Sequence, residues 1–266
     1  MTNLNSLFGA AQEEGTLSSA GAQVLNIPDL GAQIQAAIGI SVDDVTASEV
    51  ILVTPLVDDS GSIRFVPGNT EAVRDGHNGL LDALGGSKQS DGILVHCRYL
   101  NGTILYPYVP LSQAIRMDSG NYNPSGGTPL YDQIARTLGT VLAKVQEFAD
   151  AGVPCRSISV ILTDGADEHS KQHLTGASVA PLIRDLLRTE MHIIAFMGLD
   201  GGQGPDFFKR IASEMGIPAE WILTPKNNPR EIRQAFAMVS QSAVRASQAA
   251  GAAGFSKVAG GGFGSP

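Results

Sequence analysis

Three separate segments of the chain carry small oxygen-bearing side chains whose types and spacing suit a metal ion. The first, 58–62, alternates one aspartate and two serines directly after the apolar run 51–57. The second and third each place one donor beside glycine, so the full set is Asp58, Ser60, Ser62, Thr128 and Asp164. Hydroxyl and carboxylate oxygens suit Mg²⁺ better than thiolate or imidazole ligands would. Because these donors span more than a hundred positions, they converge only if the fold brings several loops to one edge.

The strands and helices that must position these donors can be recognised in the sequence. Between residues 49 and 249, short apolar runs alternate with segments whose apolar residues recur at helical spacing. Several runs are almost continuously apolar, as strands covered by helices on both faces are. This alternation predicts an α/β fold with a mostly parallel sheet. The six predicted strands are 50–57, 93–99, 103–109, 157–162, 192–197 and 221–223.

One of these strands is expected to run antiparallel to its neighbour. Asn101-Gly102, between the second and third strands, is the sequence signature of a type I′ hairpin turn. The segment 67–84 contains two glycines that each cost about 1 kcal/mol in a helix interior. We assign it a helix because the first two strands need a crossover. Apolar residues at helical spacing predict further helices across 130–145, 179–187 and 232–239.

Two terminal segments stand outside this α/β unit, so the expected division is 1–48, 49–249 and 250–266. The N-terminal extension contains a short predicted helix that follows Asp29 as its N-cap and ends before Gly39. The C-terminal segment holds six glycines without periodicity and is expected to be a flexible tail.

Charge and composition exclude several classes of partner. The formal net charge is -8, and the lysines and arginines are scattered singly, which argues against nucleic acid and acidic membranes and favours cations. No apolar run reaches the roughly 18 residues of a membrane helix. The N-terminus lacks the pattern of a signal peptide, so the expected location is cytoplasmic. The two cysteines cannot build a disulfide framework.

At its three polar motifs the chain resembles the von Willebrand factor A (VWA) domain family. The metal-ion-dependent adhesion site (MIDAS) of that family has the pattern DxSxS, then a threonine, then an aspartate. Segment 58–62 matches the first element in full, 126–132 (GGTPLYD) looks like the GGTPLYDA segment of the family, and 162–165 is similar to the third. The resemblance covers roughly residues 49–245, and the order and spacing of three motifs make it specific.

The resemblance implies a Rossmann-like sheet of six strands in the order 3-2-1-4-5-6, with helices on both faces and the antiparallel strand at one edge. It also implies that Ser60 and Ser62 bind the ion directly, that Thr128 does so in the high-affinity arrangement, and that Asp58 and Asp164 act largely through water. The ion would be Mg²⁺, with Mn²⁺ or Ca²⁺ as alternatives. Neutral hydroxyl ligands neutralise the positive charge of the ion only in part, so a carboxylate of a partner protein can complete its coordination.

Pro55 departs from what a central strand should contain. A proline has no N–H for the ladder and is rare in the middle of a sheet, so either the strand is irregular there or its pairing is offset. The crossover after Ser62 contains Pro67, and the first helix is therefore expected to begin after that residue.

These observations favour an intracellular, Mg²⁺-dependent adaptor module that captures an Asp or Glu side chain of another protein. Related stand-alone domains serve larger machines, including AAA+ ATPases, so such an ATPase is one possible partner and further copies of this chain are another. A self-assembling structural subunit that uses 1–48 and the glycine-rich tail is the first alternative. A metal-dependent hydrolase is weaker, because the sequence supplies no general base, activated nucleophile or P-loop, and we expect no enzymatic activity.

Other polar residues near the motifs have plainer interpretations. The triplet 59–61 also spells an aspartic protease motif, but that class needs an all-β fold. His169 and His173 have a spacing that can bind zinc on a helix, yet without a third ligand they are interpreted as solvated. Asp167 and Glu168 are interpreted as solvated carboxylates, with recognition of a partner or of a second cation as the alternative. His192 is expected to be structural, and 201–204 an ordinary turn.

Overall fold

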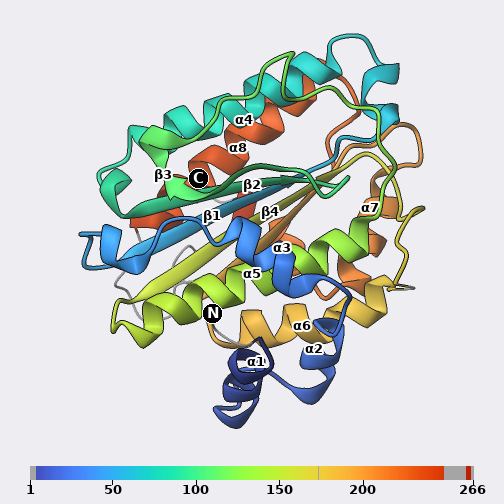
Figure 1. Cartoon of the computed structure of the whole chain (residues 1–266). Helices are drawn as coiled ribbons and strands as arrows, with labels where there is room; N and C mark the ends of the chain where they lie inside the picture. The colour runs from blue at the N-terminus through green and yellow to red at the C-terminus, as the bar shows by residue number, and fades with distance from the viewer. Residues whose placement is uncertain (1–3, 173, 249–261, 265–266) are drawn as a thin grey trace.

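The computed structural model describes residues 4–172, 174–248 and 262–264. A six-stranded sheet lies between two layers of helices, with α4 and α8 on one face and α3, α5 and α6 on the other (Figure 1). The strands are β1 (Val50–Val57), β2 (Ile93–Tyr99), β3 (Ile104–Pro110), β4 (Cys155–Thr163), β5 (His192–Gly198) and β6 (Ile222–Leu223). The helices are α1 (Leu4–Glu13), α2 (Ser19–Val24), α3 (Leu30–Ala37), α4 (Asn69–Gly85), α5 (Leu130–Asp150), α6 (Gly176–Arg188), α7 (Pro205–Glu214) and α8 (Pro229–Gln248).

The sheet has the order β3-β2-β1-β4-β5-β6. Only the edge pair β2–β3 is antiparallel within this sheet, and all the other neighbouring strands pair in parallel. The predicted fold class, strand order and antiparallel edge are therefore confirmed. Strand order reverses between β1 and β4, which places a topological switch point at the carboxyl ends of these two strands.

Pro55 leaves a gap on one side of the central strand. Every residue of β1 is buried, and its pairing with β4 is continuous through Pro55↔Val160. On the β2 side the pairs run to Val53↔Val95 and resume at Leu56↔Arg98 in the same register. The missing proline N–H thus interrupts the ladder locally, as predicted, but the alternative of an offset in pairing does not occur.

The turn between β2 and β3 differs from the predicted type I′ hairpin. A type I′ turn needs positive φ at both central residues, yet Asn101 is not among the non-glycine residues with positive φ, whereas Gly102 has φ 93°. The Gly102 N–H donates to the Tyr99 carbonyl at 3.0 Å, and the Tyr99 N–H donates to the Thr103 carbonyl at 2.8 Å. The connection is therefore a three-residue loop that ends on a left-handed glycine.

Helix α4 forms despite its glycines because one of them is required by packing. A Cβ on Gly76 would lie 2.1 Å from the Phe236 ring on α8, whereas one on Gly79 would meet nothing within 4 Å. The glycine that weakens the helix locally therefore lets α4 and α8 approach closely. The helix begins at Asn69, after Pro67, as predicted.

The N-terminal extension folds against the helices of the α/β unit. Leu30 and Ile34 of α3 belong to the same core as the sheet. At the start of α2, the backbone N–H and hydroxyl of Ser18 donate to Asp185 Oδ2 on α6 at 2.7 and 2.6 Å. Asp29 precedes α3 as expected, but with φ 59° its side chain makes no capping hydrogen bond.

Helix α7 and part of the C-terminal segment pack at the β6 side of the chain's described structure, outside the elements that were predicted from the sequence. Helix α7 was not among the predicted helices, although it begins with Pro205 directly after the glycine-rich turn and places Phe208, Ile211 and Ala212 on its buried face. Of the predicted tail, the structure describes 262–264, where the buried Phe263 ring packs edge-on against Trp221 at 5.4 Å between centroids; the rest lies outside the described residues. Within the described part of the chain, no helix has both the length and the apolar character needed to cross a membrane.

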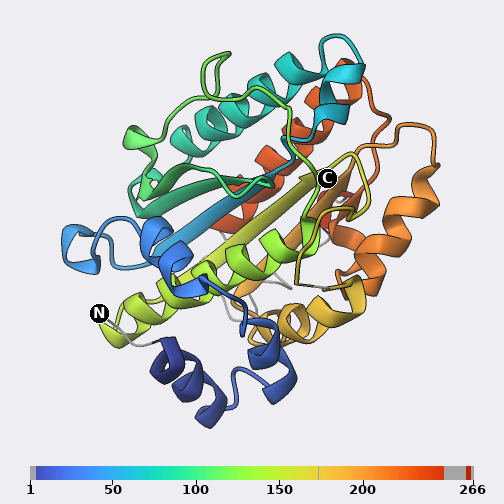
Figure 2. The same ribbon diagram turned by 45° about the vertical axis from the view of Figure 1, so that its right-hand side comes forward.

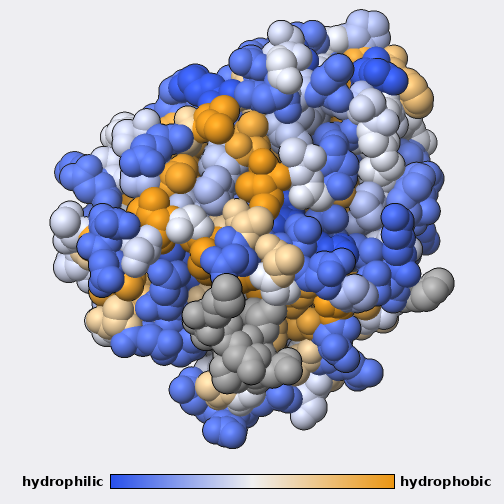
Figure 3. All heavy atoms as spheres, in the orientation of Figure 1, coloured by the Kyte–Doolittle hydropathy of each residue, from blue (hydrophilic) through white to orange (hydrophobic). Residues whose placement is uncertain are grey.

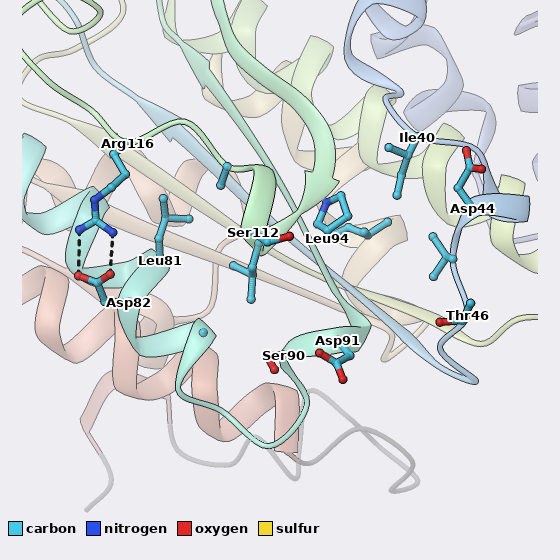
Figure 4. Close-up of a pocket in the computed structure, with 15 residues that line it drawn as sticks. Ile40, Asp44, Thr46, Leu81, Asp82, Ser90, Asp91, Leu94, Ser112 and Arg116 are labelled. Atoms are coloured by element: carbon cyan, nitrogen blue, oxygen red, sulfur yellow. Dashed lines mark hydrogen bonds and ion pairs between the residues drawn. The ribbon is translucent and has the colours of Figure 1, made fainter.

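The surface around the edge strand β3 is partly apolar (Figure 3). A cavity of about 700 Å³ opens there, lined by Ile40, Leu81 and Leu94 (Figure 4). On one side it is bordered by the ion pair of Arg116 with Asp82, which is made of two hydrogen bonds. Because Leu94 lies at the start of β2, this cavity is at the opposite end of the sheet from the switch point.

Candidate functional site

Three loops meet at the carboxyl ends of β1 and β4. The loop after β1 pairs with the segment that leads into α5 through a short bridge, in which the Gly61 N–H donates to the Gly126 carbonyl at 3.1 Å. The loop after β4 runs beside that segment (Figures 1 and 2), and the Glu168 N–H donates to the Thr128 carbonyl at 3.1 Å. All three predicted motifs therefore lie at one edge of the sheet.

Asp58 holds two of these loops together. Its side chain is fully buried, and Oδ1 accepts the Ser60 N–H at 2.7 Å. Its Oδ2 accepts the Thr163 hydroxyl at 2.7 Å and the Asp164 N–H at 3.2 Å. Because both carboxylate oxygens are already engaged by the protein, Asp58 orients the serine loop toward β4.

The other donors converge around Asp164. The Ser60 and Ser62 hydroxyl oxygens lie 2.9 Å apart, and they donate to Asp164 Oδ1 at 3.3 and 2.7 Å respectively. Thr128 is buried nearby, and its Oγ1 lies 3.8 Å from the position that a Cβ on Gly165 would take. The structure thus brings the five predicted residues into one constellation of oxygen atoms.

This constellation concentrates negative charge in a poorly solvated place. Burial raises the pKa of Asp58, and burial together with the nearby Asp58 charge raises the pKa of Asp164 to about 6. Burial also raises the pKa of Asp59 to about 6. Among the described residues, no lysine or arginine forms an ion pair with any of these carboxylates. A bound cation would balance their charge.

The chemistry of the donors fits a hard divalent cation. They are three hydroxyls and two carboxylates, which is a set of oxygen ligands. The described residues contain no group of three His, Cys, Asp or Glu side chains suited to a metal ion. A metal centre at the switch point would therefore depend on the serine and threonine hydroxyls.

Several residues that support the site were missed by sequence reasoning. Asp59 accepts the Asn101 N–H at 2.9 Å and so ties the loop after β1 to the β2–β3 turn. The Tyr122 hydroxyl donates to the Asp58 carbonyl at 2.6 Å. Asp59 lies inside a motif and was a visible candidate, whereas Tyr122 lies in an irregular segment that carries no local signal.

His169 and Gly127 form a close contact next to Thr128. His169 is exposed, as the solvated interpretation predicts, but its Nδ1 accepts the Thr128 N–H at 3.0 Å. A Cβ on Gly127 would lie 2.6 Å from the His169 ring. His169 therefore supports the threonine loop, and its predicted companion His173 lies outside the described residues.

The other polar residues considered in the sequence lie in three different environments. Asp167 is only partly exposed, and its Oδ1 accepts the Tyr131 N–H at 3.2 Å and the Ser170 hydroxyl at 2.5 Å, so this carboxylate also fixes the loop to the start of α5. Glu168 is exposed. His192 is structural as predicted, since it is buried with Nδ1 2.6 Å from the Ser157 hydroxyl.

Comparison with known proteins supports the fold. No protein-family model matches the sequence, and no curated protein matches it. Pilus adhesin SpaC from Lactobacillus rhamnosus GG, in its open conformation, is similar over 74% of this chain and 30% of its own, with 12% identity and a TM-score of 0.53. Proximal thread matrix protein 1 from the mussel byssus, with zinc in its MIDAS motif, is similar over 74% of this chain and 46% of its own, with 18% identity and a TM-score of 0.50.

The chain has the fold of a von Willebrand factor A domain. A von Willebrand factor type A protein from Catenulispora acidiphila is also similar, at 19% identity over 75% of this chain and 44% of its own, with a TM-score of 0.47. This chain spans less than half the length of each of the three proteins. The VWA fold accounts for the edge at which the motifs meet.

Proposed function

We propose that this chain is a protein-binding module that captures an acidic side chain of another protein through a divalent ion, Mg²⁺ in the first place. The observation that carries the proposal is the convergence of Ser60, Ser62 and Asp164 at the switch point of a VWA fold. When bound, the ion would supply positive charge and a coordination position open to a carboxylate oxygen.

Some residues of the site would bind the ion directly, and others would act on it indirectly. Ser60, Ser62 and Thr128 would hold the ion directly through neutral hydroxyls, which leave most of its charge available to an anion. Asp58 and Asp164 would act through water and through their hydrogen bonds to the serine loop. Because these contacts exist among the protein's own atoms, the donors are positioned by the fold itself.

The surface beside the site suits a protein ligand. A cavity of about 560 Å³ borders Ser62 and Asp164, and its rim carries the side chain of Phe65, which is 78% exposed. Lys226 lines the same cavity. Aromatic side chains are enriched in protein interfaces relative to the rest of the surface. The cysteines Cys97 and Cys155 are free and buried, which is compatible with the intracellular location that forms part of this proposal.

The metal part of the proposal is tested by binding of Mn²⁺, measured by electron paramagnetic resonance, with Mg²⁺ as competitor. We expect the double substitution Ser60→Ala and Ser62→Ala to weaken Mn²⁺ binding by about tenfold or more. The exposed serine Ser112 is the matched control, and Ser112→Ala should bind as the wild type does. Equal affinity in the double variant and the wild type would reject the metal site.

The partner part is tested by affinity capture with the full chain, in Mg²⁺ and in EDTA, alongside Asp164→Ala. We expect a set of proteins, AAA+ ATPases among them, that is captured in Mg²⁺ and lost under both other conditions while the protein stays folded. If the same proteins are captured in EDTA and by the Asp164→Ala variant, the proposal is wrong. Oligomers that dissolve on removal of 250–266 at unchanged metal affinity would instead support the self-assembling subunit, and turnover of a phosphoester or peptide panel would support the hydrolase.

A further inference from the structure

A second cavity, of about 550 Å³, adjoins the candidate metal site on the side of Thr128. It opens between the β2–β3 turn, the first turns of α5 and the loop after β4. Gly127 and Pro129, the neighbours of Thr128 in the chain, line it directly. Arg136, Lys171 and His169 line it together with one carboxylate, that of the buried Asp132. We call it the basic cavity.

Behind the basic cavity lies a buried arginine without a carboxylate partner. The Arg98 side chain is fully buried, and none of the described aspartates or glutamates forms an ion pair with it. Its guanidinium donates to Gln33 Oε1 at 2.8 Å and to Gln133 Oε1 at 3.5 Å, while Nε has no hydrogen-bond partner. Gln33 and Gln133 also line the basic cavity, so the residues that accept from Arg98 border it.

The positive charge of this region is only partly balanced. Arg136 lies 3.8 Å from Asp132, which accepts the backbone N–H of Lys171 at 2.9 Å and is the one carboxylate among the residues that line the cavity, against the charges of Arg136 and Lys171 and of Arg98 behind them. Burial and the Arg136 charge lower the pKa of Arg98 to about 10, as expected for two cations held near each other. An uncompensated buried charge is costly, and a bound anion offsets that cost. This positive region occurs in a chain whose net charge is -8.

We infer that the basic cavity binds a second anionic group, a carboxylate or a phosphate, on the same partner segment whose acidic side chain reaches the metal site. This inference rests on the proposed function for the first anchor, and on Arg98, Arg136 and Lys171 for the second. Because residues on both sides of Thr128 line the cavity, one extended segment can span the two anchors. The chain therefore selects partners that carry two acidic groups.

The cavity is tested first without metal, on protein stripped with EDTA and then dialysed free of it, using inorganic phosphate and acetate as separate probes. We expect saturable NMR shifts of the Gly102, Gly127 and Lys171 amides, because these residues line the cavity. Lys171→Glu should abolish the shifts and Asp164→Ala should keep them. Lys88→Glu, the same charge change at an exposed lysine near the opposite end of the sheet, is the matched control and should also keep them. The probe that saturates at lower concentration identifies the anion. Absence of saturable shifts, or shifts that survive Lys171→Glu, overturns the inference.

A second experiment separates this inference from the proposed function. Labelled hexaglutamate is titrated into the metal-loaded protein, and fluorescence anisotropy reports binding. We expect Lys171→Glu to weaken binding about tenfold and Lys88→Glu to leave it unchanged. Binding that needs the metal but ignores Lys171→Glu overturns the basic cavity and leaves the proposed function intact. Binding that ignores EDTA but needs Lys171 overturns the proposed function and leaves the cavity.

Discussion

The Ser62 hydroxyl donates to Asp164 Oδ1 at 2.7 Å although the two residues are 102 positions apart in the chain. This contact joins the loop after β1 to the loop after β4 across the switch point of the sheet. The buried carboxylate that accepts it has no cationic side chain paired with it among the described residues. The same atoms that hold the loops together are therefore those best placed to respond to a cation.

Asp164→Asn keeps the shape of this side chain and removes its charge. We expect divalent affinity to fall by about 10- to 100-fold, because an outer carboxylate no longer attracts the ion or orients the serine hydroxyls. In EDTA the variant should be at least as stable as the wild type, since burial already disfavours the charged carboxylate. Mn²⁺ titration and urea unfolding in EDTA measure the two effects. A variant that unfolds more readily in EDTA would show that the charge is needed for folding.

Gly127→Ala should disturb the threonine loop without touching a proposed ligand. The added Cβ would meet the His169 ring at 2.6 Å, which must move and release the Thr128 N–H. We expect a loss of about 1 to 3 kcal/mol in the free energy of unfolding, together with weaker Mn²⁺ binding. The double variant with His169→Ala removes the clashing ring and should recover part of the loss, which a double-mutant cycle measures. Strictly additive effects would contradict the contact.

Two glycines of α4 provide a matched pair for packing. Gly76→Ala should destabilise the protein by about 1 to 3 kcal/mol, because its methyl would overlap the Phe236 ring. Gly79→Ala meets nothing within 4 Å and should be neutral or stabilise by up to about 1 kcal/mol through helix propensity. Urea unfolding of both variants tests this, and neither should change Mn²⁺ affinity. Equal effects of the two substitutions would refute the close approach of α4 and α8.

His192 should make stability depend on pH. Burial lowers its pKa from 6.5 to about 4, so between these values the unfolded chain binds a proton that the folded chain does not. Its contribution is fully present above pH 6.5 and is lost as the pH falls toward 4, with a slope of at most about 1.4 kcal/mol per pH unit. His192→Gln should flatten the measured profile of unfolding free energy by that amount. An unchanged slope, or an imidazole that NMR shows protonated near pH 6, would contradict this prediction.

Much of the fold could be predicted because it is encoded locally. The apolar runs located β1 and β2 at their observed bounds, and the helical periods located α5, α6 and α8. The strand order was implied by the resemblance to the VWA family, which rests on three short motifs whose residues converge in the structure. What was predicted wrongly was local geometry under tertiary control. The β2–β3 turn is one case, because Asn101 places its N–H on Asp59 instead of adopting positive φ.

The sequence by itself determined the oxygen donors, their position after strands and the sign of the charge that they present. It could not show which side chains surround them, because those contacts join residues far apart in the chain. Tyr122 on the Asp58 carbonyl, His169 on Gly127 and Arg98 buried without a carboxylate all depend on how helices and loops pack. Local periodicity records which face of an element is apolar, whereas burial of an unpaired charge is a property of the assembled core. Only the tertiary structure therefore placed a cationic cavity beside the candidate metal site.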